Sequence, residues 1–189
     1  MKKLKVESPN AEQVIAFLKA ARAESERDFL IFALQFYGGC RVGQIVGNHD
    51  KRIPGMKPLE VEDIRDTGII VDRKGPGRWF VALDDWLLVA LRDFAGTKQG
   101  PIFNIGSDEV RLLSRKYARI SGFQDWKGFH PHLLKKALGK YLKKLGYGQF
   151  DIRDQLQHKS VTTTNTYVGV NDPEERIAIA RKVGETLRL

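Results

Sequence analysis

The chain has 189 residues, of which 42% are hydrophobic and 29% charged, as in a soluble globular protein with one sizeable domain or two small ones. No apolar run approaches the roughly 20 residues that span a bilayer, and no apolar segment follows the lysines of MKKLKVESPN, so neither a membrane span nor a signal peptide is expected. Cys40 is the only cysteine, which excludes an internal disulfide and agrees with a cytoplasmic location.

The charge balance is basic, with 32 Lys and Arg against 23 Asp and Glu, a formal net charge of +9 and a pI near 9.7. Such a surface attracts polyanions, of which nucleic acid is the commonest. Charge alone is equally compatible with a basic protein that binds no nucleic acid.

Two helices are predicted in the first forty residues. Ser8 and Pro9 have the pattern of an N-cap followed by proline at the first helical position. The segment DFLIFALQFY predicts a nearly all-apolar second helix at the centre of the domain, ended by Gly38-Gly39. Arg41 directly follows this stop, at a corner between helices. The inward face of the first helix is predicted from helical spacing to consist of Val14, Phe17, Leu18 and Ala21.

The middle of the chain predicts a loop and a hairpin. Residues 48–60, NHDKRIPGMKPLE, contain two prolines and a glycine and are expected to form an exposed loop. The segment GIIVDRKGPGRWFVAL places strand-forming residues on both sides of KGPG, with Lys74 at the mouth of the turn.

Four further helical segments follow. Asp84 and Ser107 are the expected N-caps of helices through DWLLVALRDFAG and DEVRLLSRKYARIS. After HPH, the segment LLKKALGKYLKKLG predicts an amphipathic helix ending at Gly146, and DPEERIAIARKVGETL predicts a last helix, over 173–187, capped by Asp172. The expected fold is therefore α+β, predominantly α-helical with a small antiparallel β-hairpin, in a single domain over 1–189 whose first residues, 1–7, are a basic tail.

Taken singly, the polar candidates for a functional site each have a structural explanation. Arg41 can pair with a carboxylate, Lys74 can be a solvated turn residue, and His132 can cap a helix. His158 and Tyr167 can be packing residues with their polar ends satisfied. The histidines, His49, His130, His132 and His158, show no ligand spacing, so no metal is expected.

Taken in order, these residues resemble the catalytic domain of tyrosine recombinases, the phage-integrase family, from about Ser8 to about Val170. FYGGCRVGQI resembles the first arginine box, and VDRKGPGRWFVAL the lysine-bearing hairpin. HPHLLKKAL resembles the His-x-x-Arg box, and LQHKSVTTTNTYV the segment with the second histidine and the tyrosine. The catalytic residues that the resemblance implies are Arg41, Lys74, His132, Lys135, His158 and Tyr167.

The resemblance implies a DNA strand cleaved and rejoined through a 3′-phosphotyrosine, with no cofactor. Arg41 offers two oxygens of the phosphate a planar fork, and His158 donates a further hydrogen bond. A free phenol, with a pKa near ~10, needs a base to remove its proton, and His132 is the candidate. Lys74 would protonate the departing 5′-oxygen.

The sequence departs from the family pattern at three positions. Lys135 stands where the family has a second arginine, and a lysine keeps the charge but loses the two-pronged geometry. Gln44 stands where an acidic residue often follows the first arginine, and Lys136 where a histidine is common. Register is open here, since Lys136 or Lys140 can take the role assigned to Lys135.

The resemblance also implies partners. Double-stranded DNA is the expected one, and the last helix can pack either into a neighbouring protomer, as in a tetramer on DNA, or on its own domain. Only about seven residues precede the catalytic region, so the N-terminal DNA-clamping domain of the family is expected to be absent.

Two alternatives to a recombinase or integrase stay open. One is an impaired integrase fragment, or a regulator that binds DNA without cleaving it. The other is a relaxing enzyme of the type IB topoisomerase kind.

Overall fold

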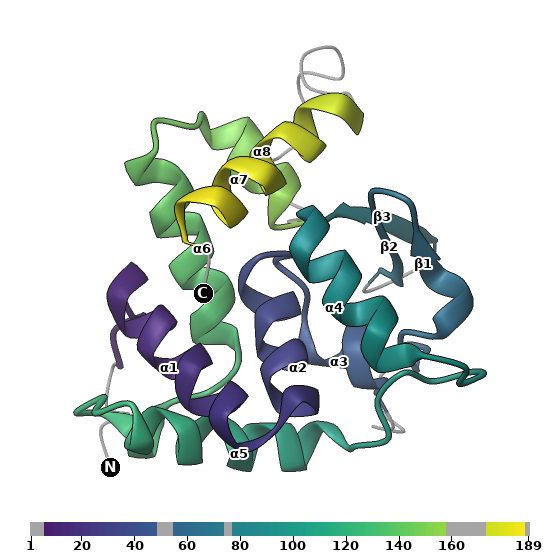
Figure 1. The fold of residues 1–189 in the computed structure, drawn as a ribbon. Helices are drawn as coiled ribbons and strands as arrows, with labels where there is room; N and C mark the ends of the chain where they lie inside the picture. Colours follow the sequence, from purple (N-terminus) through teal and green to yellow (C-terminus); the bar gives the residue numbers. More distant parts are fainter. Residues whose placement is uncertain (1–5, 49–54, 74–76, 158–172, 188–189) are drawn as a thin grey trace.

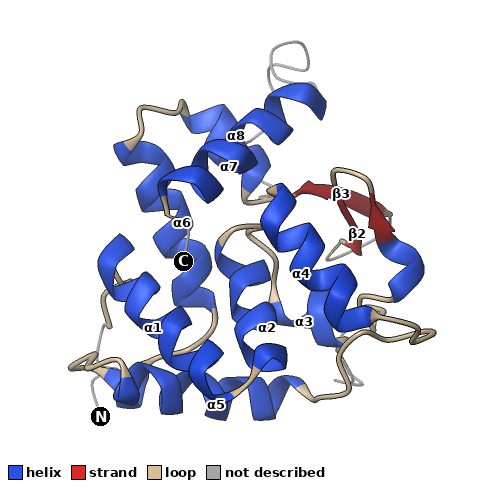
Figure 2. Cartoon of the chain, in the orientation of Figure 1, coloured by secondary structure: helices blue, strands red, loops and turns tan. Residues whose placement is uncertain are grey.

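A computed structural model of the chain describes residues 6–48, 55–73, 77–157 and 173–187. The predicted class is confirmed: the fold is mostly helical with one small antiparallel sheet at an edge of the helical body (Figures 1 and 2). The elements in chain order are α1 Ala11–Glu24, α2 Glu26–Phe36, α3 Val42–Val46, η1 Val61–Asp63, β1 Ile64–Arg65, β2 Gly68–Asp72, β3 Arg78–Ala82, α4 Asp85–Ala95, α5 Ser107–Ile120, η2 Trp126–Gly128, α6 His132–Lys144, α7 Gln149–Gln155 and α8 Pro173–Thr186.

Helix α2 is central, as its apolar sequence predicts. Every residue of α2 from Asp28 to Phe36 is buried, and the helix packs against α1, α3, α4 and α6. The predicted inward face of α1 is confirmed, because Val14, Phe17, Leu18 and Ala21 are all buried. Aromatic rings fill the space between these helices, with Phe17 stacked on Phe129 at 5.1 Å between ring centroids. Arg41 therefore follows a helix that is buried along most of its length.

The predicted hairpin is confirmed and forms part of a three-stranded sheet in the order β1-β2-β3. Strands β2 and β3 pair antiparallel from Gly68 opposite Ala82 to Asp72 opposite Arg78. Gly68 is required at its position, since an added Cβ would lie 2.1 Å from the carbonyl oxygen of Val81. The short strand β1, paired with β2 through Ile64 and Ile69, was not predicted.

Two predicted helix caps are wrong by one or two residues. Helix α1 is capped by Asn10 instead of Ser8, because Asn10 and Gln13 exchange hydrogen bonds in a capping box at 2.9 and 3.0 Å. Helix α5 includes Ser107, and Gly106 is its N-cap. The predicted cap at Asp84 is confirmed, and so is the predicted helix end at Gly146, which has φ +90° just beyond the last helical turn.

The loop predicted at 48–60 is only partly exposed. Leu59 is buried, and its backbone pairs with Ile45 and Ile102, while residues 49–54 lie outside the described residues. The basic tail predicted at 1–7 is described only at Val6 and Glu7, and Val6 packs against the core. Helix α7 was not predicted, since it has seven residues and buries polar side chains.

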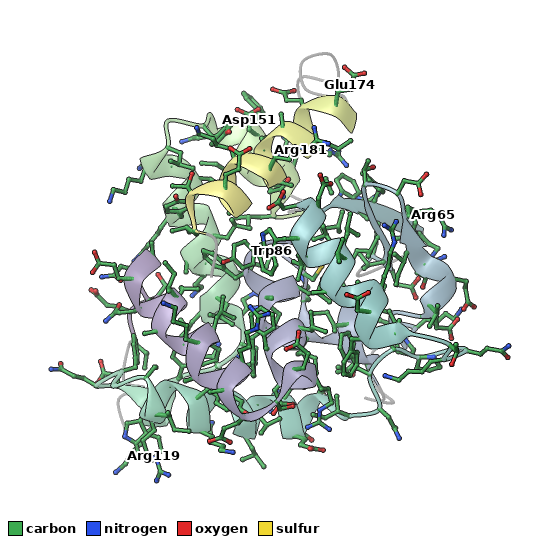
Figure 3. The ribbon with its side chains drawn as sticks, viewed as in Figure 1. Arg65, Trp86, Arg119, Asp151, Glu174 and Arg181 are labelled. Atoms are coloured by element: carbon green, nitrogen blue, oxygen red, sulfur yellow. The ribbon has the colours of Figure 1, made fainter. Side chains whose placement is uncertain are left out.

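Helix α8 packs on its own chain. Ile179, Ala180, Val183 and Leu187 are buried, and the Tyr37 hydroxyl donates a hydrogen bond of 2.6 Å to the carbonyl oxygen of Leu187. The predicted cap Asp172 lies outside the described residues. Trp86, labelled near the middle of the view in Figure 3, is partly buried and its ring meets that of Tyr37 at 5.2 Å, while Arg119 and Glu174 project outward. No helix in the described parts of the chain is long and apolar enough to cross a bilayer.

Candidate active site

The turn between α2 and α3 places Arg41 at the edge of the core. Gly39 has φ +61°, and a Cβ there would lie 2.9 Å from the carbonyl oxygen of Gln155. Only glycine combines this backbone conformation with such a close approach. The turn therefore packs directly against the chain that leads to His158.

Arg41 is the N-cap residue of α3 and is half-buried. Its backbone N–H donates to the side-chain oxygen of Gln44 at 2.7 Å, and its guanidinium donates to the carbonyl oxygen of Gln157 at 3.4 Å. Burial lowers the pKa of Arg41 from its usual value. The long contact to Gln157 uses one of the five N–H donors of the guanidinium. The other donors of Arg41 can bind an anion.

Lys135 lies on the buried face of α6 and is only 2% exposed. Its ammonium donates a hydrogen bond of 2.7 Å to the carbonyl oxygen of Gly39, two residues before Arg41. Burial, followed by the charge of Arg41, lowers the pKa of Lys135 to about 7. Lys135 is thus a buried cation that ties α6 to the turn carrying Arg41.

His132 is the first residue of α6, one helical turn before Lys135, and its side chain reaches the surface. The surrounding protein still desolvates the ring enough to lower its pKa to about 4, with further contributions from Lys135, Arg41 and His130. The imidazole is therefore neutral at physiological pH, and an anion bound beside it would raise this pKa and make the ring a stronger proton acceptor.

Arg41, His132 and Lys135 form what we call the cationic cluster, named for the charges of Arg41 and protonated Lys135; His132 is its neutral member. The structure brings these three predicted site residues together, although they come from two segments over ninety positions apart. The neighbouring charges that lower the pKa values of His132 and Lys135 are all cationic or basic groups, among them Arg41 and His130. The fixed charge of Arg41 and the partly protonated Lys135, with a neutral imidazole beside them, favour an anionic ligand.

The other three predicted site residues, Lys74, His158 and Tyr167, lie outside the described residues. Asp72 and Gln157, the neighbours of two of them in sequence, are described and lie beside the cluster. The side chain of Gln44 donates to the carbonyl oxygen of Asp72 at 2.7 Å and to the side-chain oxygen of Gln157 at 2.8 Å. The segments that precede Lys74 and His158 therefore both meet the Arg41 segment.

Sequence reasoning missed Gln44 as a site residue and noted it only as a departure from a pattern. The available signal was a lone glutamine in the otherwise apolar stretch VGQIV, since an amide buried there needs hydrogen-bond partners. No group of three or more His, Cys, Asp or Glu side chains among the described residues has the arrangement of a metal site.

The chain is similar in sequence to curated tyrosine recombinases. It is 24% identical over 173 residues to a tyrosine recombinase of Pseudothermotoga lettingae, a match that covers 86% of this chain and 56% of the relative. It is 25% identical over 171 residues to tyrosine recombinase XerC of Caldanaerobacter subterraneus, covering 82% of this chain and 44% of the relative. The chain spans about half the length of these relatives. No protein-family model matches it.

Solved recombinase structures share the fold. The XerA recombinase superposes with a TM-score of 0.66 at 20% identity, covering 98% of this chain and 66% of that one. The XerH site-specific recombinase bound to its difH substrate superposes with a TM-score of 0.61 at 15% identity, covering 84% and 50%. The chain is thus a relative of the tyrosine recombinases and has the fold of their catalytic domain.

Proposed function

We propose that the chain is the catalytic part of a site-specific DNA recombinase or integrase, which cleaves and rejoins DNA strands through a 3′-phosphotyrosyl intermediate. The observation that supports it best is the cationic cluster of Arg41, His132 and Lys135, which draws together residues of two motifs on the fold that recombinases share.

A DNA phosphate suits the cluster electrostatically. A phosphodiester is a monoanion, and attack on it builds further negative charge on its equatorial oxygens. The guanidinium of Arg41 would bind two of these oxygens, and preorganised donors of this kind act most strongly on charge that develops in the transition state. An anion here would also relieve the repulsion between Arg41 and Lys135, which lowers the pKa of the lysine.

Lys135 would stabilise the negative charge of the phosphate without touching it, because its side chain is buried. Its ammonium already donates to Gly39, and the side chain is buried, so its contribution to the phosphate is long-range charge together with support of the Arg41 turn. Arrival of the phosphate would raise the lowered pKa of Lys135 and favour its charged form.

The covalent step would proceed by in-line displacement at phosphorus. The phenolic oxygen of Tyr167 forms a bond to phosphorus as the bond to the 5′-oxygen breaks. Neutral His132 accepts the phenolic proton, and Lys74 supplies a proton to the departing 5′-oxygen. His158 donates a hydrogen bond to the phosphate. Rejoining reverses these transfers, and no cofactor takes part.

The proposed partner is double-stranded DNA, in agreement with the net charge of +9 and with the DNA-bound state of the similar XerH structure. This partner would keep the protein with DNA in the cytoplasm. A homo-oligomer on DNA, up to a tetramer, would use α8 as the exchanged element. In the isolated chain α8 packs in cis, so exchange would replace the contacts of Val183 and Leu187 with the same contacts in a neighbour.

A trapping experiment tests the proposal and identifies the target sequence at the same time. The protein is incubated with nicked duplexes whose sequence around the nick is randomised, so that a cleaved strand cannot be rejoined, and protein-bound strands are isolated under denaturing conditions and sequenced. We expect a covalent adduct on an enriched sequence, and none with Tyr167→Phe.

The controls separate the alternatives. DNA binding by the unmodified protein without any adduct would contradict the proposal and favour a non-cleaving DNA-binding protein. Relaxation of an arbitrary supercoiled plasmid by the monomer would instead indicate an activity of the type IB topoisomerase kind.

A further inference from the structure

We infer that Gln44 and Gln157 form a positioning clasp, which aligns Arg41 with the two chain segments that lead to Lys74 and His158. The inference rests on the proposed function and adds two residues to it. Neither glutamine needs to touch the phosphate, because each acts through the backbone or side chain of a neighbour.

Gln44 joins three chain segments at one buried point. Its side chain is fully buried, and its amide oxygen accepts the backbone N–H of Arg41 at 2.7 Å. Its amide nitrogen donates to the carbonyl oxygen of Asp72 at 2.7 Å and to the side-chain oxygen of Gln157 at 2.8 Å. One acceptor and both donors are therefore in use.

The partners fix which way the Gln44 amide points. A backbone N–H can only donate and a backbone carbonyl can only accept, so Arg41 requires the oxygen of Gln44 and Asp72 requires its nitrogen. The second N–H then faces Gln157, whose side-chain oxygen must be the acceptor. A glutamate at position 44 would keep the contact to Arg41, but its ionised carboxylate would face the carbonyl oxygen of Asp72 without a proton between them.

Gln157 is held in a conformation that it would not favour alone. Its φ is +52°, and it is the only non-glycine residue with positive φ among those described. Its carbonyl oxygen accepts from Arg41, and its side chain accepts from Gln44. Strained residues of this kind persist where surrounding contacts determine them and are common at functional sites.

Neighbouring packing leaves this segment little room to shift. Leu156, the preceding residue, is buried against α6, where a Cβ at Gly139 would lie 2.9 Å from its side chain. Lys74 comes two residues after Asp72, and His158 directly follows Gln157. A change at the clasp should therefore move the proposed catalytic groups relative to Arg41, and small misplacements of this kind cost on the order of 100-fold in rate.

The test measures single-turnover cleavage of a nicked duplex carrying the sequence enriched by the trapping experiment, at several DNA concentrations. The variants are Gln44→Ala, Gln44→Glu and Gln157→Gly. Gln157→Gly accommodates positive φ, so it removes the side-chain contact without adding backbone strain. Gln35→Ala is the matched control, because Gln35 is as buried as Gln44 and, among the described residues, its side chain bonds within α2, to the carbonyl oxygen of Ile31.

We expect all three clasp variants to lower the cleavage rate constant by about 10- to 100-fold, with the half-saturating DNA concentration unchanged. Gln35→Ala should lower the unfolding temperature and leave the rate constant unchanged. The rate of Gln44→Glu relative to the unmodified protein should rise as the pH falls, since protonation returns one donor to the side chain, whereas the Gln44→Ala ratio should stay constant.

Two results would contradict the clasp. One is cleavage by Gln44→Ala and Gln157→Gly as fast as by Gln35→Ala, and the other is a loss that appears only as weaker DNA binding. Both require an adduct with the unmodified protein. The absence of any adduct would instead overturn the proposed function and, with it, the role of the clasp in cleavage.

Discussion

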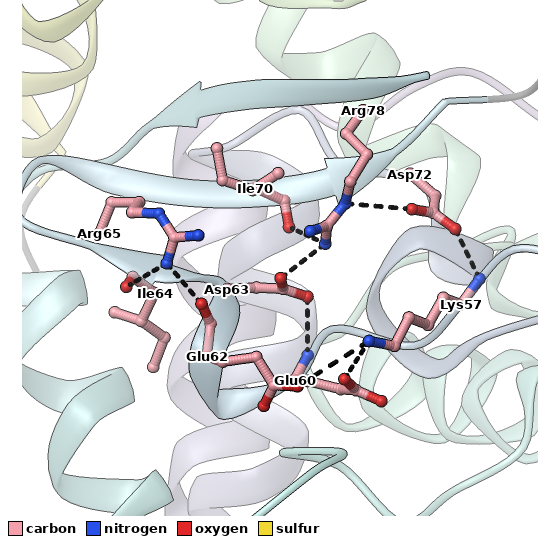
Figure 4. A network of polar contacts seen from close by, with 9 residues as sticks. All are labelled: Lys57, Glu60, Glu62, Asp63, Ile64, Arg65, Ile70, Asp72 and Arg78. Carbon is pink, nitrogen blue, oxygen red and sulfur yellow. Dashed lines mark hydrogen bonds and ion pairs between the residues drawn. The ribbon is translucent and has the colours of Figure 1, made fainter. Parts of the chain in front are cut away.

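Two regions of the molecule hold basic side chains close together, and they differ in whether a carboxylate of the described residues pairs with each cation. At the base of the sheet, Arg78 pairs with Asp63 at 2.6 Å and with Asp72 at 3.4 Å (Figure 4). Lys57 pairs there with Glu60 and, at 3.9 Å, with Glu62. We call these six residues the ion-pair network.

The pKa values of the two regions move in opposite directions. Hydrogen bonds and nearby carboxylates raise the pKa values of Arg78, through Asp63, and of Lys57, through Glu60. In the cationic cluster, burial lowers the pKa values of all three residues. Neighbouring basic groups lower those of His132 and Lys135 further. Balanced charges stabilise the fold by themselves, whereas an unbalanced group of cations is costly until an anion arrives. The contrast separates a structural use of charge from a functional one.

The largest expected effect is on the unbalanced side. Arg41→Ala should lower the single-turnover cleavage rate by about 100- to 1000-fold, the usual consequence of removing one donor to a developing oxyanion. The cleavage rate of Arg41→Lys should lie between those of Arg41→Ala and the unmodified protein, since lysine keeps the charge and loses the two-pronged geometry of the guanidinium. Arg119→Ala, which removes an exposed arginine of α5, is the control for net charge. A loss of less than tenfold in Arg41→Ala would contradict the assigned role.

The second prediction concerns stability against pH at Lys135. Its folded-state pKa of about 7 lies below the ordinary value of 10.5, so between these limits the unfolded chain binds more protons. Stability should therefore rise with pH across this range, by at most about 1.4 kcal/mol per pH unit. Lys135→Met removes this dependence and should be more stable than the unmodified protein at pH 7.

Urea denaturation of both proteins at several pH values checks this prediction. The difference in unfolding free energy should be largest at or below pH 7 and should shrink by about 2 kcal/mol toward pH 9. Subtraction cancels the titration of groups that the two proteins share. A difference that stays constant from pH 7 to pH 9.5 would show that the lysine does not titrate there.

Much of the fold follows from local sequence patterns. Helical spacing predicted α1 and its buried face, the apolar run predicted α2, and the KGPG turn predicted the β2–β3 hairpin. The elements that were missed lack such patterns. Strand β1 has two residues, and α7 buries Asp154 and Gln155 where an apolar face is expected. The cap at Ser8 was misplaced because Asn10 forms the better capping box.

The site was predictable as a set of residues but not as a set of contacts. The order of motifs selected Arg41, His132 and Lys135, and the structure brings them together. The burial of Lys135 under the Gly39 carbonyl depends on a contact between residues 96 positions apart, and the Gln44–Gln157 bond spans 113 positions. Contacts this distant in sequence leave no local signal.

The smallest expected effect is on the balanced side. Asp63 is buried, and its carboxylate accepts from Arg78 and from the backbone N–H of Glu60. Asp63→Asn keeps the shape, but it replaces a charge-assisted hydrogen bond with a neutral one, so the free energy of unfolding should fall by about 1 kcal/mol. The loss should be partial because Arg78 is 42% exposed and can turn to solvent.

Urea denaturation at pH 7 measures the loss, and the cleavage rate of the folded variant should match that of the unmodified protein. A cleavage defect comparable to that of Arg41→Ala would mean that the ion-pair network acts in catalysis as well as in folding, and the division between the two regions would then fail.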